Sequence, residues 1–224
     1  MITSSQNSSI KKLKLLQKNK NQRTKDKVFI VEGLRAVKEI PKEWPIVQYV
    51  ISESFADSTQ EIIKGDSASV LYVSDSVFAS ISDTKTPQGI MVVASQPDYS
   101  IDQVMTQEQG FFIIADGIQD PGNLGTLLRT AHGAGAHGLF LSKGCVDIYN
   151  PKTIRATMGS IFHIPLFIDL DIEWLIRRLM THDTNLYATA LEESKMLYDY
   201  DYTKKTGIII GNEANGISEK TKEM

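Results

Sequence analysis

The stretch FFIIADGIQDPGNLGTLLRTAHGAGAHGLFLS, residues 111–142, decides the fold class of this 224-residue chain. It opens with a continuous apolar run, passes through a loop of Gly, Asp, Pro and Asn, and then shows helical spacing before a second apolar run. Apolar strands separated by a helix are typical of a parallel sheet that helices cover on both faces. Because open α/β sheets bind ligands at the carboxyl ends of their strands, we expect a ligand site at the loop after the first run.

The hexapeptide GAGAHG, residues 133–138, matches the dinucleotide-binding pattern G-x-G-x-x-G but stands in the wrong context. That pattern has to follow a strand and open a helix. Here it closes a helix and leads into a strand, so we interpret its glycines as a helix C-terminus and as sites of close helix–strand packing. The sequence therefore argues against a nicotinamide-dependent dehydrogenase.

The first hundred residues alternate between helix and strand patterns. Ile10, Leu13 and Leu16 recur at helical spacing, with Ser8 or Ser9 as the expected cap. Apolar runs bounded by turn residues predict strands at 28–33, 46–51, 70–73 and 89–94. Helical patterns predict helices at 34–40, 54–64 and 75–82.

A polar stretch at 95–103 predicts a linker between this part and the remainder of the chain. After it we expect strands at 111–116, 138–142, 164–168, 185–190 and 206–211, and helices at 123–134, 150–158 and 171–182. The predicted fold is thus α/β throughout, with a small N-terminal domain, 1–97, and a parallel-sheet domain, 98–224.

Residues 1–30 carry a concentrated positive charge on an otherwise acidic chain. The whole chain has a net charge of −3, and eight basic groups against the single acid Asp26 give this segment +7, which leaves −10 for the rest. The basic groups are Lys11, Lys12, Lys14, Lys18, Lys20, Arg23, Lys25 and Lys27. Such a segment favours contact with a polyanion, and a merely solvated helix face is the other interpretation of the same pattern.

The composition disfavours several classes of protein. The chain is 42% hydrophobic and 23% charged, as in ordinary globular proteins. It shows no run of about 18 apolar residues and no signal-peptide core, and its single cysteine, Cys145, suits a reducing compartment. We therefore expect a cytoplasmic protein. His132 and His137 are five residues apart and join no ligand cluster, so no metal site is predicted.

The junction ADGIQDPGNLGTLLRTA, residues 115–131, connects the first strand of the parallel sheet to its helix. Asp120 and Pro121 tighten the turn, the glycines allow close backbone approach, and Asn123 is expected to cap the helix. Arg129, about one and a half turns into that helix, is placed to reach back over the loop. A cation there suits a phosphate or a developing oxyanion, and a surface salt bridge is the alternative role.

These residues carry a family resemblance. The segment DPGNLGTLLRTAHGAGAHGLFLS, 120–142, resembles the first signature of the SpoU (TrmH-type) RNA ribose 2′-O-methyltransferases of the SPOUT superfamily. GCVDIYNPKTIRATMGSIFHIPL, 144–166, resembles the segment that follows it, and GIIIGNEANGIS, 207–218, resembles the second signature. Residues 4–40 are similar to the small substrate-binding domain of the rRNA-modifying members.

The resemblance implies a methyltransferase domain of the trefoil-knot type that binds S-adenosylmethionine (AdoMet) and forms a homodimer. It implies RNA as the substrate, with rRNA favoured because tRNA-specific relatives commonly lack the N-terminal domain. Asn123 and Arg129 match the catalytic Asn and Arg of the family, and Glu213 matches its second-signature acid. The positions that the resemblance assigns to the cofactor are Ala190, Gly211, Asn212, Gly216 and Ile217.

Basic residues in two segments are predicted to contact RNA phosphates. Lys152 and Arg155 are three residues apart, on one face of the predicted helix 150–158, where a phosphate clamp or a solvated face would fit. The full set of predicted RNA contacts is Lys11, Lys12, Lys14, Arg23, Lys152 and Arg155.

The handling of the proton is open at this point. Because a guanidinium is not deprotonated in proteins, we expect Arg129 to hold a phosphate and to stabilise the developing alkoxide. Two roles stay open for Glu213, which either accepts the proton as a base or only fixes the loop that carries it.

The family's third signature, a Ser-Leu-Asn-containing loop with a final helix, does not follow the second signature within these 224 residues. We therefore expect an incomplete knot region, weak binding of AdoMet by this chain, and a natural protein that continues past Met224. The alternative function is a non-catalytic RNA-binding protein of the same fold that has lost AdoMet binding.

Overall fold

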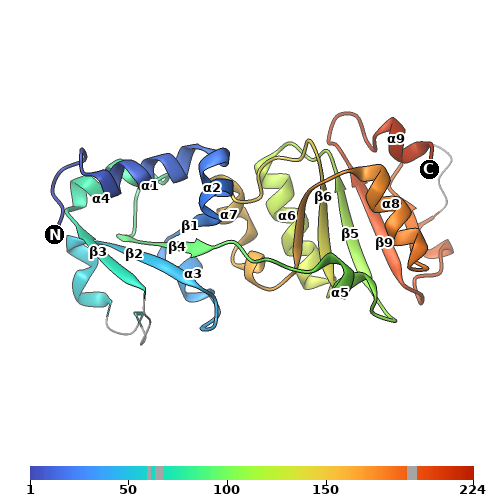
Figure 1. Cartoon of the computed structure of the whole chain (residues 1–224), viewed down its shortest axis with the longest axis horizontal. Helices are drawn as coiled ribbons and strands as arrows, with labels where there is room; N and C mark the ends of the chain where they lie inside the picture. Colours follow the sequence, from blue (N-terminus) through green and yellow to red (C-terminus); the bar gives the residue numbers. More distant parts are fainter. Residues whose placement is uncertain (60–61, 64–67, 191–195) are drawn as a thin grey trace. The chain divides into compact units, whose positions relative to one another are not determined.

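The computed structural model describes residues 1–59, 62–63, 68–190 and 196–224, which form two compact units (Figure 1). The first unit comprises Met1–Pro97 and Asp147–Phe162, and the second comprises Asp98–Val146 and His163–Met224. Segment 147–162 thus folds with the N-terminal unit, whereas the sequence analysis placed it in the range 98–224. None of the described helices is long and apolar enough to cross a membrane.

The first unit is built on a four-stranded mixed sheet with the order β1-β4-β2-β3. Its strands are β1 (Val28–Glu32), β2 (Ile46–Ser52), β3 (Ser69–Val73) and β4 (Ile90–Ser95), close to the predicted ranges. β4 pairs antiparallel with both β1 and β2, while β2 and β3 pair in parallel. The strand positions were therefore predictable from apolar runs, but the mixed direction of the sheet was not.

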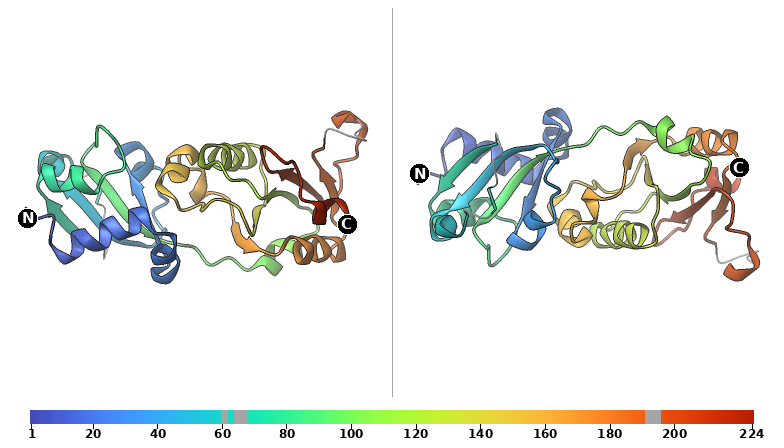
Figure 2. Two further views of the ribbon diagram at one scale, coloured as in Figure 1. Left: turned by 90° about the horizontal axis from the view of Figure 1, so that it is seen from above. Right: turned by 90° about the horizontal axis from the view of Figure 1, so that it is seen from below.

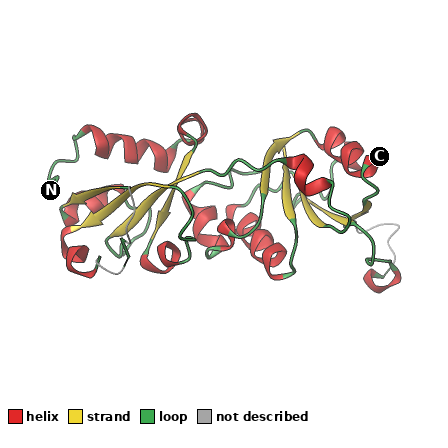
Figure 3. Ribbon diagram, turned by 60° about the horizontal axis from the view of Figure 1, so that its bottom comes forward, coloured by secondary structure: helices red, strands yellow, loops and turns green. Residues whose placement is uncertain are grey.

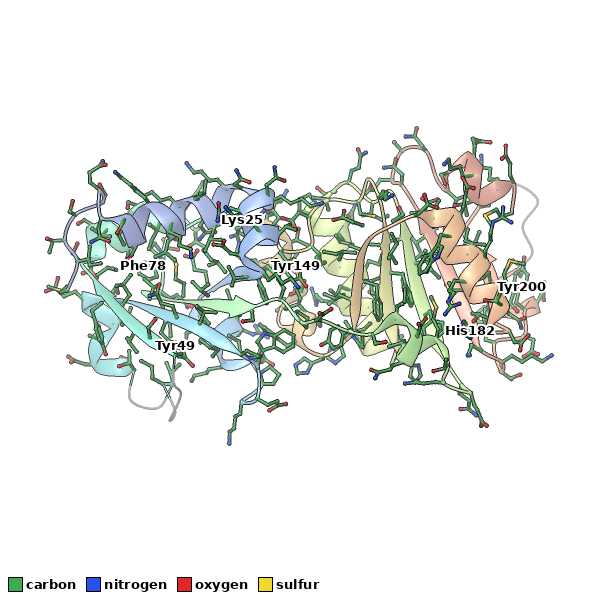
Figure 4. All side chains as sticks on the ribbon, viewed as in Figure 1. Lys25, Tyr49, Phe78, Tyr149, His182 and Tyr200 are labelled. Carbon is green, nitrogen blue, oxygen red and sulfur yellow. The ribbon has the colours of Figure 1, made fainter. Side chains whose placement is uncertain are left out.

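Helices cover this sheet and close its core. They are α1 (Ser8–Lys18), α2 (Lys20–Asp26), α3 (Leu34–Lys38) and α4 (Asp75–Ile81). Ile10, Leu13 and Leu16 face a buried cluster that includes Phe78, which Figure 4 labels. The N-cap of α1 is Asn7, whose side chain accepts the Ser9 N–H, so the expected Ser8 or Ser9 cap was wrong by one or two residues.

The predicted helix at 54–64 is only partly present. Residues Glu53–Ser58 form the 3-10 helix η1 instead of an α-helix. Positions 60, 61 and 64 of that prediction lie outside the described residues.

Segment 147–162 completes the core of the first unit. It contains helix α7 (Pro151–Thr157) and the short 3-10 helix η2 (Ser160–Phe162). The ring of Tyr149, labelled in Figure 4, lies 4.9 Å from that of Phe29 on β1, and Phe162 meets Trp44 edge to face at 5.0 Å. Burial of these large aromatic surfaces explains why the segment packs on β1.

The second unit holds a five-stranded sheet with the order β7-β6-β5-β9-β8. The strands are β5 (Phe111–Asp116), β6 (Gly138–Ser142), β7 (Leu166–Leu170), β8 (Asn185–Ala188) and β9 (Thr206–Gly211). Every neighbouring pair is parallel, which confirms the parallel sheet predicted from the continuous apolar runs. Figure 3 shows the strands of both sheets in yellow.

Helices lie on both faces of the parallel sheet. They are α5 (Ile101–Met105), α6 (Pro121–Gly133), α8 (Ile172–Thr181) and the short α9 (Glu219–Lys222), with a 3-10 helix η3 (Leu197–Asp199). Figure 2 shows α6 on one face and α5 with α8 on the other. α6 ends at Gly133 with Gly135 in the left-handed region, which confirms that the glycines of 133–138 close a helix. The linker predicted at 95–103 ends earlier, because α5 begins at Ile101.

Candidate active site at the carboxyl edge of the parallel sheet

The candidate site lies where β5 and β9 end side by side. These strands pair in parallel from Phe111–Thr206 to Asp116–Gly211, so their following loops leave the sheet at one edge. Asn212 Nδ2 donates to the carbonyl oxygen of Gly117 over 2.9 Å, which joins the two loops directly. Two loops that are hydrogen bonded to each other therefore lie at the sheet edge where the ligand site was predicted.

The turn from β5 into α6 is capped by Asp120, not by Asn123. Asp120 Oδ1 accepts the backbone N–H of Asn123 over 2.9 Å, and Pro121 takes the first helical position, where its missing N–H costs nothing. The expected Asn123 cap was wrong because Asp and Asn cap equally well and the turn selects the earlier residue. This arrangement frees the Asn123 amide to donate to Glu213 Oε1 over 3.1 Å.

Glu213 fastens the second loop to the first. Its carboxylate accepts the backbone N–H groups of Gln119 and Asp120 at 3.3 and 3.2 Å. It also accepts the side-chain amides of Asn123 at 3.1 Å and Asn212 at 3.3 Å. Four donors from both loops converge on one exposed carboxylate.

These donors bear on the two roles left open for Glu213. Burial acts to raise the pKa of Glu213, but hydrogen bonds from its own backbone N–H, from Asn123 and from the β5–α6 turn outweigh it and hold the pKa below its usual range. A carboxylate of lowered pKa is a poor proton acceptor near neutral pH. The geometry therefore favours Glu213 as the residue that fixes the loop.

Arg129 is exposed on α6, eight residues after Pro121 and so about two turns into the helix instead of the expected one and a half. Gly122 and Thr126 precede it at spacings of seven and three residues, so they share its helix face. Helical side chains point back toward the N-terminus, so the expected direction of the Arg129 side chain is toward the loop. Within the described parts of the chain, its guanidinium has no recorded ion pair or hydrogen bond.

The structure thus brings Asn123 and Glu213 into direct contact, and Arg129 lies on the same helix without touching them. Sequence reasoning missed a further residue of this edge, Asp116. This buried carboxylate at the end of β5 accepts the Ser218 N–H at 2.8 Å and the Thr221 hydroxyl at 2.7 Å, and it anchors the far end of the second loop. The signal in the sequence that could have identified Asp116 is an acidic residue at the end of an apolar strand.

The predicted cofactor positions gather at the same edge. Gly211 ends β9, and Asn212 and Gly216 close a tight turn through N–H to oxygen contacts of 2.7 and 2.9 Å. A Cβ on Gly211 would lie 2.1 Å from the carbonyl carbon of Gly216, so only glycine fits this approach. The side chain of Ile217 belongs to the buried core cluster, which leaves only its backbone to a ligand.

Ala190 lies on the exit of the neighbouring strand. β8 pairs in parallel with β9 up to Ala188 and Ile209, and the Thr189 N–H still donates to Ile209 over 3.0 Å. The exposed Ala190 therefore follows beside the end of β9. Small residues and backbone polar groups line this edge, and such groups can pair with the polar edge of the flat adenine ring of AdoMet.

The predicted RNA contacts divide into two groups. Lys11 and Lys12 are exposed on α1, Lys14 is half-buried there, and Lys12 pairs with Asp26 at 3.2 Å. Arg23 is 3% exposed and its guanidinium is taken up by Asp147, which argues against the predicted contact with RNA. We therefore leave Arg23 out of the proposed RNA surface.

The proposed clamp of Lys152 and Arg155 lies on α7, in the first unit. Lys152 is exposed. Arg155 Nη1 lies 2.7 Å from Asp83 Oδ2, which is an ion pair by distance although the angle is not that of a hydrogen bond. The two cations remain on one short helix, but Arg155 already has a carboxylate partner. Among the described residues, no cluster of His, Cys, Asp and Glu could hold a metal ion.

Comparison with known proteins identifies both parts of the chain. Residues 110–224 match the SpoU rRNA methylase family, and residues 7–92 match the MRM3-like substrate binding domain. The Bacillus subtilis 23S rRNA (guanosine(2553)-2′-O)-methyltransferase RlmP is 31% identical over 216 residues, which are 96% of this chain and 84% of the relative.

Solved structures show the same architecture. The AdoMet-bound rRNA methyltransferase from Sinorhizobium meliloti superposes with a TM-score of 0.87 at 29% identity, over 99% of this chain and 84% of that one. The SpoU methyltransferase AviRb from Streptomyces viridochromogenes has a TM-score of 0.86 at 23% identity, over 97% and 84%, and shares the fold.

Fold, loop geometry and matches together define a methylase domain preceded by a substrate-binding domain. The chain belongs to the SpoU rRNA methylase family.

Proposed function

We propose that this protein is an AdoMet-dependent RNA methyltransferase that methylates a ribose 2′-hydroxyl of rRNA. The observation that carries the proposal is the joined pair of loops at the ends of β5 and β9, where Glu213 holds Asn123 beside the positions predicted for the cofactor. Family membership supports the reaction, and the relative named as a 23S rRNA 2′-O-methyltransferase supports the substrate and the modified atom.

AdoMet would supply an activated methyl group on its sulfonium sulfur, and the neutral thioether would be the leaving group. The protein's own task is alignment and polarisation. Gly211, Gly216 and Ala190 would present backbone edges to the adenosyl group, and Asn212 would keep their loop closed. Binding of the adenosyl group in this way requires no charged side chain at this edge.

The remaining residues act on the RNA side. Arg129 remains a cation throughout, so it would hold a phosphate of the target nucleotide and stabilise the ribose oxygen as the hydroxyl loses its proton to solvent or to an RNA phosphate oxygen. Asn123, fixed by Glu213, orients the ribose with its amide oxygen. Glu213 stays ionised and keeps the two loops in register.

The N-terminal unit would bind the RNA through phosphate contacts. Helix α1 carries Lys11, Lys12 and Lys14. The apolar residues of the same helix face the core. Backbone contacts of this kind position an RNA without reading its sequence. The assignment of 1–97 to RNA binding, of 98–224 to catalysis and of a homodimer as the active assembly stays a prediction.

The experiment uses the protein with methyl-labelled AdoMet and unmodified 23S rRNA. A ribose 2′-O-methyl group blocks alkaline hydrolysis, so the expected product is an alkali-resistant dinucleotide that carries the label. Arg129→Ala serves as the inactive control. Label recovered on a base, or no label at all, would contradict the proposal.

The alternative of a non-catalytic RNA-binding protein is not favoured. The three residues that match the family's catalytic positions are all present, and the methyltransferase relative aligns over 96% of the chain. RNA binding without any transfer of label in the same experiment is the result that would restore this alternative.

A further inference from the structure

A cavity of about 200 Å³ in the first unit lies outside the candidate active site. One wall is the end of β1 with helix α3, a second is Gln88 ahead of β4, and the third is α7. The side chains that line it include Arg35, Ala36, Glu39, Gln88, Arg155 and Met158. All of them belong to the first unit, so the cavity is a feature of that unit by itself.

The local backbone holds this cavity open. Gly33 has a φ of 96°, a conformation suited to glycine, at the turn from β1 into α3. Gln88 Oε1 accepts the Leu34 N–H over 2.8 Å, which leaves the amide NH₂ group of Gln88 for a ligand. On the other side, a Cβ on Gly159 would lie 2.7 Å from Glu39 Cβ, so the turn after α7 is pressed against α3.

The lining suits a flat, neutral ligand with polar edges. The lining has two cations, Arg35 and Arg155, and two carboxylates, Glu32 and Glu39, so the cavity has no excess positive charge that would select a free phosphate. Its volume is below the range of about 300–1,000 Å³ that drug-sized ligands occupy. Guanidinium planes stack on nucleobases, and amides and carboxylates pair with base edges. Asp83 holds the Arg155 guanidinium in place at the wall.

We propose that this cavity binds one unstacked nucleobase of the RNA substrate. The inference rests on the proposed function, because it takes the ligand to be the RNA that the protein methylates. Sequence-dependent recognition of RNA uses unpaired bases that are splayed out and held between side chains. The lysines of α1 attract any RNA backbone, whereas this cavity adds a contact that requires a base.

One variant fills the cavity without altering its charge, and a second removes a lining cation. Ala36→Phe places a ring in the space, Arg35→Ala removes the exposed lining cation, and Lys38→Ala removes an exposed cation of the same helix that does not line the cavity. The probes are a short fluorescent single-stranded RNA and its abasic counterpart, which has the same phosphates and no bases. Fluorescence anisotropy measures both affinities, and circular dichroism verifies that each variant is folded.

The wild type should bind the base-containing RNA roughly tenfold more tightly than the abasic strand, as one base contact allows. Ala36→Phe and Arg35→Ala should each lose most of this ratio. Lys38→Ala should weaken both probes equally and keep the ratio. A folded Ala36→Phe variant with the full wild-type ratio, or a wild type without any preference for bases, would overturn the proposal.

Methylation kinetics separate this inference from the proposed function. Ala36→Phe should raise the KM for rRNA more than it lowers kcat, because the cavity acts on binding. A wild type that prefers bases but transfers no methyl group would contradict the proposed function and leave the cavity assignment intact. If the wild type methylates rRNA and both cavity variants have the wild-type KM for rRNA, the cavity assignment alone is contradicted.

Discussion

Removal of the Arg23 guanidinium is expected to destabilise the first unit more than removal of any exposed lysine. Arg23 and Asp147 are 3% and 11% exposed, and Arg23 Nε donates to Asp147 Oδ2 over 3.0 Å. Arg23 Nη1 also donates to the carbonyl oxygens of Leu16 and Gln17 in the last turn of α1, where helical partners are missing. Arg23→Ala leaves these acceptors and a buried carboxylate without their cation.

The magnitude follows from that burial. Loss of one partner from a buried ion pair costs about 3–5 kcal/mol, against a total stability of about 5–15 kcal/mol for a folded domain. With a urea m-value of about 2 kcal/mol/M, the unfolding midpoint should fall by roughly 2 M. The two tryptophans, Trp44 in the first unit and Trp174 in the second, report on separate units. Unfolding monitored in Trp174→Phe and Trp44→Phe backgrounds therefore assigns the loss to one unit.

Two further variants make this measurement decisive. Lys12→Ala breaks an ion pair in which the lysine side chain is 64% exposed, and such pairs contribute about 0–1 kcal/mol. The double variant Arg23→Met with Asp147→Leu replaces the ion pair by apolar side chains and should recover most of the lost stability. The reasoning is refuted if Arg23→Ala moves the Trp44 midpoint no further than Lys12→Ala does.

Four other predictions concern catalysis, the pH dependence of the loop and RNA binding. Glu213→Gln should lower kcat/KM because the loop is held less firmly. The pH profile of kcat/KM should keep its shape at neutral and alkaline pH. Loss of one limb of that profile would instead show that Glu213 acts as the base. Because the folded-state pKa of Glu213 is lowered, its stabilising effect is present at neutral pH and is lost as the pH falls through that pKa, which loop proteolysis at acidic pH would detect. Arg129→Ala should abolish methyl transfer and leave the unfolding curve unchanged, and Arg129→Lys should also be poor because lysine lacks the planar fork; a Lys variant with most of its kcat would contradict that role. Replacement of Lys11, Lys12 and Lys14 by Gln should flatten the salt dependence of RNA binding, by a log–log slope of about 0.7 for each single-strand phosphate that the lysines no longer neutralise, whereas an unchanged slope would mean solvated lysines.

Local pattern sufficed for the parallel sheet. Runs such as 111–116 and 206–211 are almost entirely apolar, as strands buried on both faces require. The helix C-terminus at Gly133 was equally predictable, because glycines after a helical pattern terminate it. The cap of α6 was not, since Asp120 and Asn123 have the same preference and the geometry of the turn chooses between them.

The role of Glu213 needed the folded chain. Its sequence neighbours are compatible with a base and with a loop anchor alike. Besides its own backbone N–H, the donors that lower its pKa come from Gln119, Asp120 and Asn123, about ninety residues away along the chain. Pairing of β5 with β9 brings these donors together, and no property of the local sequence measures that distance.

The same reason separates what could be inferred from what could not in the first unit. Charge and helical spacing identified a basic α1 with an apolar face, because both properties belong to neighbouring residues. They also counted Arg23 among the RNA contacts, and only its burial beside Asp147 removes it. Segment 147–162 lies between β6 and β7 in sequence, yet it packs in the first unit, where Tyr149 and Phe162 contact the rings of Phe29 and Trp44. Periodicity thus predicts most of the elements, whereas competition for buried area between distant elements determines where an element packs and which of its side chains remain available for function.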